Sequence, residues 1–299
     1  MKILLFGKGG QVGWELQRSL SILGEVIALD SDSANLCGDF TNLAGIAATV
    51  RTVKPDVIVN AAAHTAVDKA ESEADLVRTI NALAPGVLAQ EAAAIGACLV
   101  HYSTDYVFDG TGERAWLETD QPAPLSTYGA TKLEGERLIQ QADCQHLIFR
   151  TSWVYGARGG NFAKTMLKLA QERDALKVIN DQIGAPTGAD LLADVTAHAI
   201  PAVIAQPKLS GLYHLVAAGE TSWHGYASFV LAYAEQAGIS LRVNSDAIQA
   251  VPTSAFPTAA KRPLNSRLNT EKLQASFNLY LPPWQVGVER MLMEVLGKW

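Results

Sequence analysis

The sequence predicts an α/β protein built on a Rossmann-type, doubly wound parallel sheet, followed by a smaller mixed α/β substrate lobe. Over the first 150 residues, short apolar runs alternate with longer stretches of helical spacing. The apolar runs are continuous, which indicates strands that are buried on both faces. A glycine-rich turn follows the first run directly. This alternation is typical of parallel strands joined by crossover helices.

The elements of this first part follow one another in regular order. The runs predicted as strands are Ile3–Phe6, Val26–Leu29, Val57–Val59, Cys98–Tyr102 and Leu147–Phe149. The segments between them that carry helical spacing are Gln11–Leu23, Leu43–Val53, Leu76–Ile95 and Tyr128–Gln141. We therefore place a first domain at residues 1–150.

The pattern loosens after Arg150, because eight of the twelve prolines lie beyond it and interrupt the apolar runs. Helices are predicted there at Asn161–Gln171, Leu191–Ala205, His224–Ala237 and Trp284–Leu296. We place the smaller lobe at residues 151–299. Segments near 188–216 are expected to return to the first domain and extend its sheet.

Composition restricts the partners of the chain. The 24 Lys and Arg residues and 30 Asp and Glu residues give a net charge of −6, which disfavours binding to nucleic acid or to an anionic membrane. The first apolar run is too short for the core of a signal peptide, and no run of 18 apolar residues follows. Three cysteines without a C-x-x-C pair suit a reducing compartment. We therefore expect a cytoplasmic protein.

Gly7, Gly10 and Gly13 follow the first strand with the spacing G-x-x-G-x-x-G and open the first helix. Glycine permits a tight turn with positive φ and lets the backbone approach a pyrophosphate. The helix N-terminus then offers free N–H groups to the phosphates. This pattern predicts a dinucleotide-binding domain, and a purely structural glycine turn is the alternative.

Asp30 ends the second strand, twenty residues after Gly10, where a carboxylate can accept hydrogen bonds from an adenosine ribose. A carboxylate at this position favours NAD over its 2′-phosphorylated form. Since no arginine lies between residues 30 and 36, the residues favour NADH or the use of both cofactors. Asp30 could also be a simple turn or cap residue. Asp39 and Phe40 are placed to frame the adenine.

Tyr128 and Lys132 are four residues apart, so they share one face of a predicted helix. A phenol is a poor acid at neutral pH, and a nearby cation lowers its pKa. We therefore expect Lys132 to make Tyr128 a usable proton donor to a ketone oxygen. The hydroxyls of Ser103 and Thr104 end the preceding strand, at the edge where parallel sheets bind ligands. Caps of the strand end are the alternative role for these two hydroxyls.

The glycines, Thr104, Tyr128 and Lys132 together resemble the fingerprint of the extended short-chain dehydrogenases/reductases. Longer strings resemble the dTDP-4-dehydrorhamnose reductase family within that group. They are A-A-A-H-T-A-V-D-K-A-E from Ala61, S-T-D-Y-V-F-D-G from Ser103, T-S-W-V-Y-G from Thr151, D-Q-I-G-A-P-T from Asp181 and K-R-P-L-N-S-R-L from Lys261. The resemblance covers nearly the whole chain.

This resemblance implies an NAD(P)H-dependent reduction of dTDP-4-dehydro-6-deoxy-L-mannose to dTDP-L-rhamnose for cell-surface polysaccharide such as O-antigen. Tyr128 would protonate the C4 oxygen, Lys132 would hold the nicotinamide ribose, and Thr104 would orient the ketone. The implied cofactor contacts are Gly10, Gln11, Val12, Ala62, Ala63, His64, Thr65 and Tyr102. The implied sugar contacts are Asp105 and Trp153, and Arg262 is assigned to the diphosphate because an arginine fork matches phosphate geometry.

The family also implies a homodimer with a magnesium ion at the subunit contact. Glu15 and Asp190 are the acids that we assign to such an ion, since Mg²⁺ prefers carboxylate oxygens and retains waters.

Two other functions remain open. A non-catalytic, dinucleotide-binding regulatory subunit shares this fold, but the catalytic residues are intact here. An epimerase or dehydratase of the same superfamily is the second alternative. Dehydratases carry an Asp-Glu pair after the strand-end threonine, whereas Asp105-Tyr106 follows Thr104 in this chain.

Overall fold

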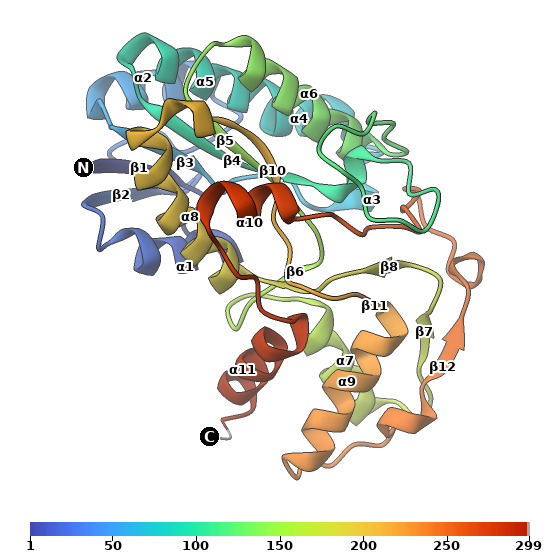
Figure 1. Ribbon diagram of the computed structural model, residues 1–299. Coiled ribbons are helices and arrows are strands. Elements are labelled where there is room, and N and C mark those ends of the chain that lie inside the picture. Colours follow the sequence, from blue (N-terminus) through green and yellow to red (C-terminus); the bar gives the residue numbers. More distant parts are fainter. Residues whose placement is uncertain (298–299) are drawn as a thin grey trace.

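Six parallel strands form the central sheet of the computed structural model, which describes residues 1–297 (Figure 1). They are β1 (Lys2–Phe6), β2 (Glu25–Leu29), β3 (Val57–Asn60), β4 (Cys98–Thr104), β5 (His146–Thr151) and β10 (Gly211–His214). Their order is β10-β5-β4-β3-β1-β2, and every ladder is parallel. The predicted doubly wound sheet is confirmed. The strand order reverses between β1 and β3, the point at which such sheets bind ligands.

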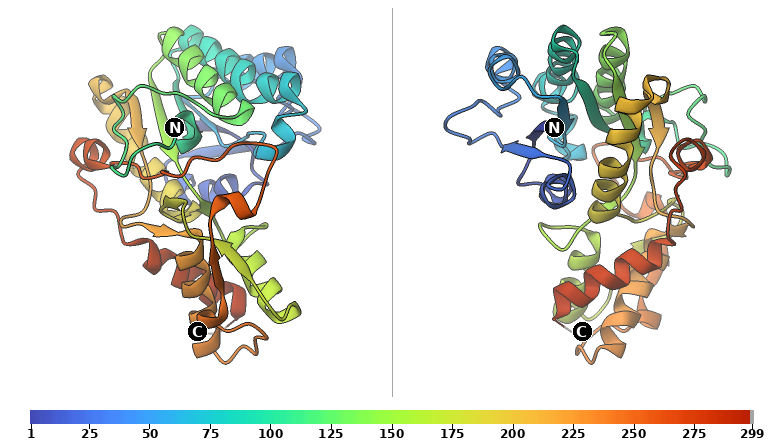
Figure 2. Two further views of the ribbon diagram at one scale, coloured as in Figure 1. Left: turned by 90° about the vertical axis from the view of Figure 1, so that its right-hand side faces the viewer. Right: turned by 60° about the vertical axis from the view of Figure 1, so that its left-hand side comes forward.

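Alternate side chains of β1 enter two hydrophobic clusters, one on each face of the sheet. Ile3 and Leu5 pack with residues of α1 (Gln11–Leu20) and α8 (Ala189–Ala205). Leu4 and Phe6 pack with residues of α2 (Leu43–Val53), α5 (Ala84–Ile95) and α6 (Thr127–Gln141). Figure 2 shows α2, α5 and α6 along one side of the sheet and α1 and α8 along the other. Burial on both faces is the reason that the strands read as continuous apolar runs.

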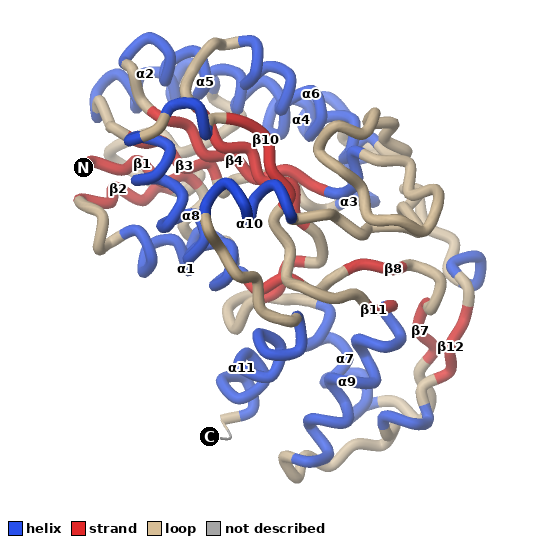
Figure 3. Tube along the Cα trace, in the orientation of Figure 1, coloured by secondary structure: helices blue, strands red, loops and turns tan. Residues whose placement is uncertain are grey.

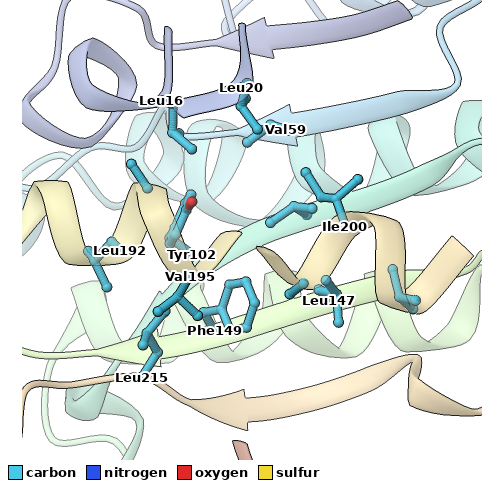
Figure 4. Close-up of a cluster of buried hydrophobic side chains, with 14 of the residues drawn as sticks. Leu16, Leu20, Val59, Tyr102, Leu147, Phe149, Leu192, Val195, Ile200 and Leu215 are labelled. Atoms are coloured by element: carbon cyan, nitrogen blue, oxygen red, sulfur yellow. The ribbon is translucent and has the colours of Figure 1, made fainter. Parts of the chain in front are cut away.

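The cluster beneath α1 and α8 joins segments that are far apart in the sequence (Figure 4). Its labelled members are Leu16 and Leu20 of α1, Leu192, Val195 and Ile200 of α8, Val59, Tyr102, Leu147 and Phe149 of the strands, and Leu215. The Tyr102 hydroxyl lies 2.6 Å from the hydroxyl of Thr196, which is buried on α8. Residues after 150 therefore cover one face of the sheet that residues 1–150 begin.

A separate hydrophobic cluster holds the lower part of the molecule together, where helices predominate (Figure 3). Its helices are α7 (Phe162–Glu172), α9 (Trp223–Gln236) and α11 (Trp284–Leu296). Three two-stranded sheets accompany them: β6 (Val154–Tyr155) with β9 (Thr187–Gly188), β7 (Lys177–Ile179) with β12 (Gln249–Val251), and β8 (Ile183–Gly184) with β11 (Thr221–Ser222).

The segments at 188–216 lie with the first sheet. Helix α8 packs on α1, and β10 pairs with β5, placing Gly211 beside Leu147. Helix α10 (Glu271–Phe277) also contributes Leu273 and Phe277 to the cluster on this face. The division of the chain into two domains at residue 150 stays a prediction.

Several short elements are absent from the sequence prediction because they lack a hydrophobic repeat of useful length. They are α3 (Val67–Ala70), α10, the strands of the three small sheets and the 3₁₀ helices η2 (Asp105–Val107), η3 (Pro207–Leu209), η4 (Ser245–Ala247) and η5 (Thr253–Ala255). Among residues 1–297, none of the helices combines the length and apolar character that a membrane span requires.

The helix predicted at Leu76–Ile95 differs in the structure. Helix α4 (Ala74–Arg78) passes into a π-helical stretch, η1 (Thr79–Leu83), and then into α5. Pro85 lies in the first turn of α5 and has no backbone N–H to donate to the carbonyl of Asn81, four residues earlier. The freed carbonyl faces Gly135 of α6, where an added Cβ would lie 2.3 Å from the Asn81 oxygen. Glycine at position 135 therefore permits the close approach of α6 to η1.

We expect Gly135→Ala to lower the free energy of unfolding by about 1–3 kcal/mol, because the new methyl group meets backbone that cannot rotate away. Denaturant unfolding measures this loss. Gly160→Ala is the matched control, since a Cβ at position 160 has nothing within 4 Å. Equal stability of the two variants would contradict the close packing of α6 on η1.

Candidate active site

A cleft of about 480 Å³ opens at the carboxyl ends of the central strands. It is lined by residues from both parts of the chain: Gly10, Gln11, Val12, Ala61, Ala63, Thr65, Val67, Tyr102, Ser103, Thr104, Asp105, Tyr106, Tyr128, Lys132, Thr151, Ser152, Trp153, Val154, Leu192 and Trp223. A second cavity of about 280 Å³ shares Gly10, Ala61 and Ala63 with it. The two cavities therefore adjoin each other beside the glycine loop.

The glycine loop fits closely against the end of β3. Gly7 has a φ of +85°, and an added Cβ would lie 2.7 Å from the backbone of Ala61. A Cβ at Gly13 would lie 1.9 Å from the Gly7 oxygen. Gly10 occupies the N-cap position of α1 without a side-chain hydrogen bond, so the backbone N–H groups at this helix end have no side-chain cap. These features are suited to a pyrophosphate.

The acids and the aromatic ring that we assigned to the adenosine line the second cavity. Asp30, Asp39 and Phe40 all face it. One oxygen of Asp30 accepts a hydrogen bond from the Gly9 N–H at 3.0 Å, so this carboxylate also shapes the loop. Asp39 accepts hydrogen bonds from the N–H and hydroxyl groups of Thr41. Phe40 is buried, and its ring packs edge-to-face with that of Phe6.

The segment after β3 is held by two asparagines. Asn60 accepts a hydrogen bond from the Ala62 N–H at 3.0 Å. The side chain of Asn81 accepts from the His64 N–H at 2.9 Å and donates to the His64 carbonyl at 3.0 Å. The π-helical stretch thus positions this loop, in which Ala63 and Thr65 face the cleft and Ala62 faces the second cavity. The His64 ring lies 3.2 Å from Glu73 and is not among the lining residues described for either cavity.

Tyr128 and Lys132 extend from the first two turns of α6 into the cleft. Ser126 starts this helix by accepting a hydrogen bond from the Gly129 N–H at 3.2 Å. Thr104 ends β4 opposite them; its hydroxyl donates to Asp105 and accepts from the Tyr106 N–H, each at 3.1 Å. The three residues that we predicted to be catalytic therefore line one cavity.

The electrostatics of this group differ from our expectation. Burial raises the pKa of Tyr128 to about 12, and a hydrogen bond with Thr104 only partly opposes this. Burial lowers the pKa of Lys132 to about 8, opposed by the nearby charge of Glu136. The expected net lowering of the phenol pKa is wrong for this structure: burial raises the pKa of Tyr128, and the Lys132 Nζ donates to the Tyr102 carbonyl at 2.5 Å. Desolvation outweighs the cation here.

Asp105 is buried at the same end of the cleft, and one of its carboxylate oxygens has no hydrogen-bond partner. Burial raises the pKa of this carboxyl to about 7, and hydrogen bonds to neighbouring hydroxyl groups offset only part of the shift. An unpartnered oxygen in the lining is available to a polar group of a ligand.

Two tryptophans form an aromatic part of the cleft wall. Trp153 has a φ of +49°, and its ring stacks on that of Trp223 with centroids 3.7 Å apart. Trp153 was assigned to the sugar from the sequence, whereas Trp223, at the start of α9, was missed. Nothing in the sequence near Trp223 distinguishes it from a core residue.

Arg262 lies outside the set of residues described as lining the cleft. Its guanidinium forms an ion pair with Asp68 at 2.6 Å, so the fork assigned to the diphosphate already has a carboxylate partner. Its assignment stays a prediction.

The acids assigned to magnesium lie together in a cavity of about 30 Å³ beside Glu294 and Arg290. Glu15 pairs with Arg18 at 3.3 Å, and Asp190 lies 3.8 Å from Arg290. No group of three metal-ligating side chains occurs within residues 1–297. Because both carboxylates already face arginines, the magnesium site stays a prediction, and the chemistry below involves no metal.

The parallel sheet, the glycine loop and the Thr104, Tyr128 and Lys132 group define a dinucleotide-dependent enzyme of the short-chain dehydrogenase/reductase class. Residues 1–296 match the family model described as the RmlD substrate binding domain, and the chain belongs to this family.

Curated relatives agree over nearly the full length. The dTDP-4-dehydrorhamnose reductase of Shigella flexneri is 61% identical over 99% of this chain and 98% of its own length, and that of Escherichia coli strain K12 gives the same values. Among solved structures, the dTDP-4-dehydrorhamnose reductase of Clostridium acetobutylicum superposes with a TM-score of 0.88 at 36% identity, covering 99% of this chain and 100% of that one. The Bacillus anthracis enzyme in complex with NADP gives 0.86 and 35%, covering 98% and 99%. The family expected from the sequence motifs is confirmed.

Glu136 and Arg150 form an ion pair beneath the site, with 1% and 4% of their side chains exposed. We expect Glu136→Gln to lower the free energy of unfolding by about 3–5 kcal/mol, because it leaves the guanidinium buried without a countercharge. Denaturant unfolding measures the change. Glu134, on the same helix as Glu136, forms a more exposed ion pair with Arg78 of α4. Glu134→Gln should therefore have little effect on stability. A similarly small effect at position 136 would contradict this account.

The raised pKa of Asp105 predicts a pH-dependent stability. Because the folded state holds this proton up to about pH 7, the wild type should lose up to about 4 kcal/mol as pH rises from about 4 to about 7. Asp105→Asn removes this component, so the variant should gain stability relative to the wild type at pH 8 but not at pH 4. Unfolding curves of both proteins across this range test the difference. Parallel pH profiles would show that Asp105 does not titrate near neutrality.

Proposed function

We propose that this chain reduces the C4 ketone of dTDP-4-dehydro-6-deoxy-L-mannose with NAD(P)H, giving dTDP-L-rhamnose for cell-surface polysaccharide such as O-antigen. The observation that carries the proposal is the position of Thr104, Tyr128 and Lys132 in one cleft continuous with the glycine loop. The 61% identity to dTDP-4-dehydrorhamnose reductases over 99% of the chain supports the substrate.

The cofactor supplies a hydride from its reduced nicotinamide when it is bound. The glycine loop accepts no Cβ at Gly7 or Gly13 without a clash, which fits a backbone cradle for its pyrophosphate. Asp30 lines the cavity assigned to the adenosine and would accept hydrogen bonds from a ribose. The relative solved with NADP has the phosphorylated cofactor, so we extend the proposal to both NADH and NADPH.

Tyr128 would act as the proton donor. With a pKa of about 12, its phenol keeps the proton at neutral pH and can give it to the ketone oxygen as negative charge develops there. Lys132, with a pKa of about 8, carries a positive charge at pH 7 that stabilises the resulting phenolate. Thr104 offers a hydroxyl to orient the ketone.

The sugar would lie between the polar end of the cleft and the aromatic wall. Asp105 has a free carboxylate oxygen for a sugar hydroxyl, and the Trp153 ring offers an apolar face to a deoxysugar. We also propose a cytoplasmic homodimer. The free cysteines Cys37, Cys98 and Cys144 suit a reducing compartment.

Tyr128→Phe removes the proposed proton donor and leaves the ring in place. We expect kcat to fall by about 10²–10⁴-fold while NADPH binding persists. Cofactor oxidation with dTDP-4-dehydro-6-deoxy-L-mannose, followed by product analysis, measures turnover with NADH and NADPH separately. Tyr226→Phe is the matched control, because the buried Tyr226 hydroxyl has no hydrogen-bond partner to lose.

Unchanged turnover of Tyr128→Phe with intact cofactor binding would remove Tyr128 from this role. A wild-type protein that binds but never oxidises either cofactor would favour the regulatory binding module. Turnover that recycles the cofactor without net consumption would favour an epimerase or dehydratase.

A further inference from the structure

Three buried polar side chains form a row behind the cleft, from β3 through β4 to α6. The Asn60 Nδ2 lies 3.0 Å from the His101 Nδ1, and the His101 Nε2 lies 3.2 Å from the Lys132 Nζ. Their exposed fractions are 1%, 1% and 2%. Asn60 and His101 are not described among the lining residues of the two cavities. Of the three side chains, Lys132 is the one that lines the cleft.

The direction of the first hydrogen bond is fixed by the backbone. The Asn60 Oδ1 accepts from the Ala62 N–H, which turns the amide so that its NH₂ group faces His101. The His101 Nδ1 must therefore be an acceptor, because it meets a donor. Burial keeps the His101 pKa well below its usual value, so the ring is neutral. A neutral imidazole with an unprotonated Nδ1 carries its hydrogen on Nε2.

This tautomer presents an N–H group to Lys132. A hydrogen bond from the His101 Nε2 needs a lone pair on the Lys132 Nζ, which the neutral amine has and the ammonium lacks. The Nζ donates in turn to the Tyr102 carbonyl. Burial of Lys132 favours the amine as well, so the two effects act in the same direction.

Other charged groups around α6 leave this contact in place. Glu136, one turn further along α6, favours the ammonium, but it is paired with Arg150 of β5 and accepts from Ser103 of β4. Tyr128 on α6 and Asp105 in η2 face the cleft. Other ionisable groups on or beside elements packed against α6 have contacts of their own: Asp68 with Arg262, Arg78 with Glu134, Glu91 with Arg51, and Glu71 with Thr127.

We propose that Asn60 and His101 are positioning residues for Lys132: Asn60 fixes the Nε2–H tautomer of His101, and that N–H favours the neutral amine over the ammonium. This inference rests on the proposed function, in which Lys132 must be charged to stabilise the phenolate of Tyr128. By favouring the neutral amine of Lys132, Asn60 and His101 would lower the pH above which reduction declines.

The tautomer can be read without any turnover. In long-range ¹H–¹⁵N spectra of the wild-type protein, we expect a neutral histidine protonated at Nε2 whose signal disappears in His101→Gln. His214 is the internal control, since its Nδ1 faces the Trp116 carbonyl at 3.1 Å and must carry the hydrogen there. A His101 signal protonated at Nδ1 would overturn the proposal, whether or not the protein is a reductase.

Asn60→Asp should reverse the arrangement. The carboxylate still accepts from Ala62 but also accepts from the His101 Nδ1, which moves the hydrogen to Nδ1 and turns the lone pair of Nε2 toward Lys132. The alkaline fall of kcat/KM, expected near pH 8 in the wild type, should then move to higher pH by about one unit. His198→Gln, on α8 and bonded to the Phe277 carbonyl, should leave the pH profile unchanged.

Asn60→Asp changes both the local charge and the tautomer of His101. Making the same substitution in a His101→Phe background measures the effect of the charge alone. A charge effect alone would shift the pH profile equally in both backgrounds, and that result would overturn the proposal. A smaller shift without the imidazole supports it. An inactive wild type would contradict the proposed function, and the spectra would still decide the tautomer.

Discussion

A buried ion pair fixes the helix that carries Tyr128 and Lys132 to the sheet. Arg150 of β5 donates two hydrogen bonds to Glu136 of α6, and Ser103 of β4 donates a third. All three groups are removed from water, so the arrangement persists only while every partner is present. Because Glu136 follows Lys132 by one helical turn, this ion pair holds the part of α6 that carries Lys132 against β4 and β5.

The other side of α6 depends on a backbone irregularity. Pro85 interrupts the hydrogen-bond ladder of the preceding helical segment, and the Asn81 carbonyl that it frees meets Gly135. The side chain of the same Asn81 forms hydrogen bonds with both backbone groups of His64, beside the two cavities. Asn81 therefore contacts both α6, which carries Tyr128 and Lys132, and the loop after β3.

Much of this arrangement could be predicted from sequence, for identifiable reasons. The strands and the glycine loop repeat a pattern that burial and backbone geometry impose, and the spacing of Tyr128 and Lys132 places them on one helix face in any context. The spacing of residues does not show how deeply Tyr128 is buried or which group the Lys132 Nζ contacts. For this reason the expected lowering of the Tyr128 pKa was wrong. Trp153 stacks on Trp223 and Arg262 pairs with Asp68. These partners come from distant segments, so no local sequence pattern predicts them.

The position of β10 has a consequence for biosynthesis. This edge strand of the central sheet and the overlying helix α8 come from residues 189–214, although β1 to β5 end at residue 151. A nascent chain that has just delivered β5 exposes an unpaired strand edge and an uncovered apolar face. The central sheet therefore stays incomplete until some sixty further residues have emerged with α8 and β10, and its apolar face stays partly open until α10 follows.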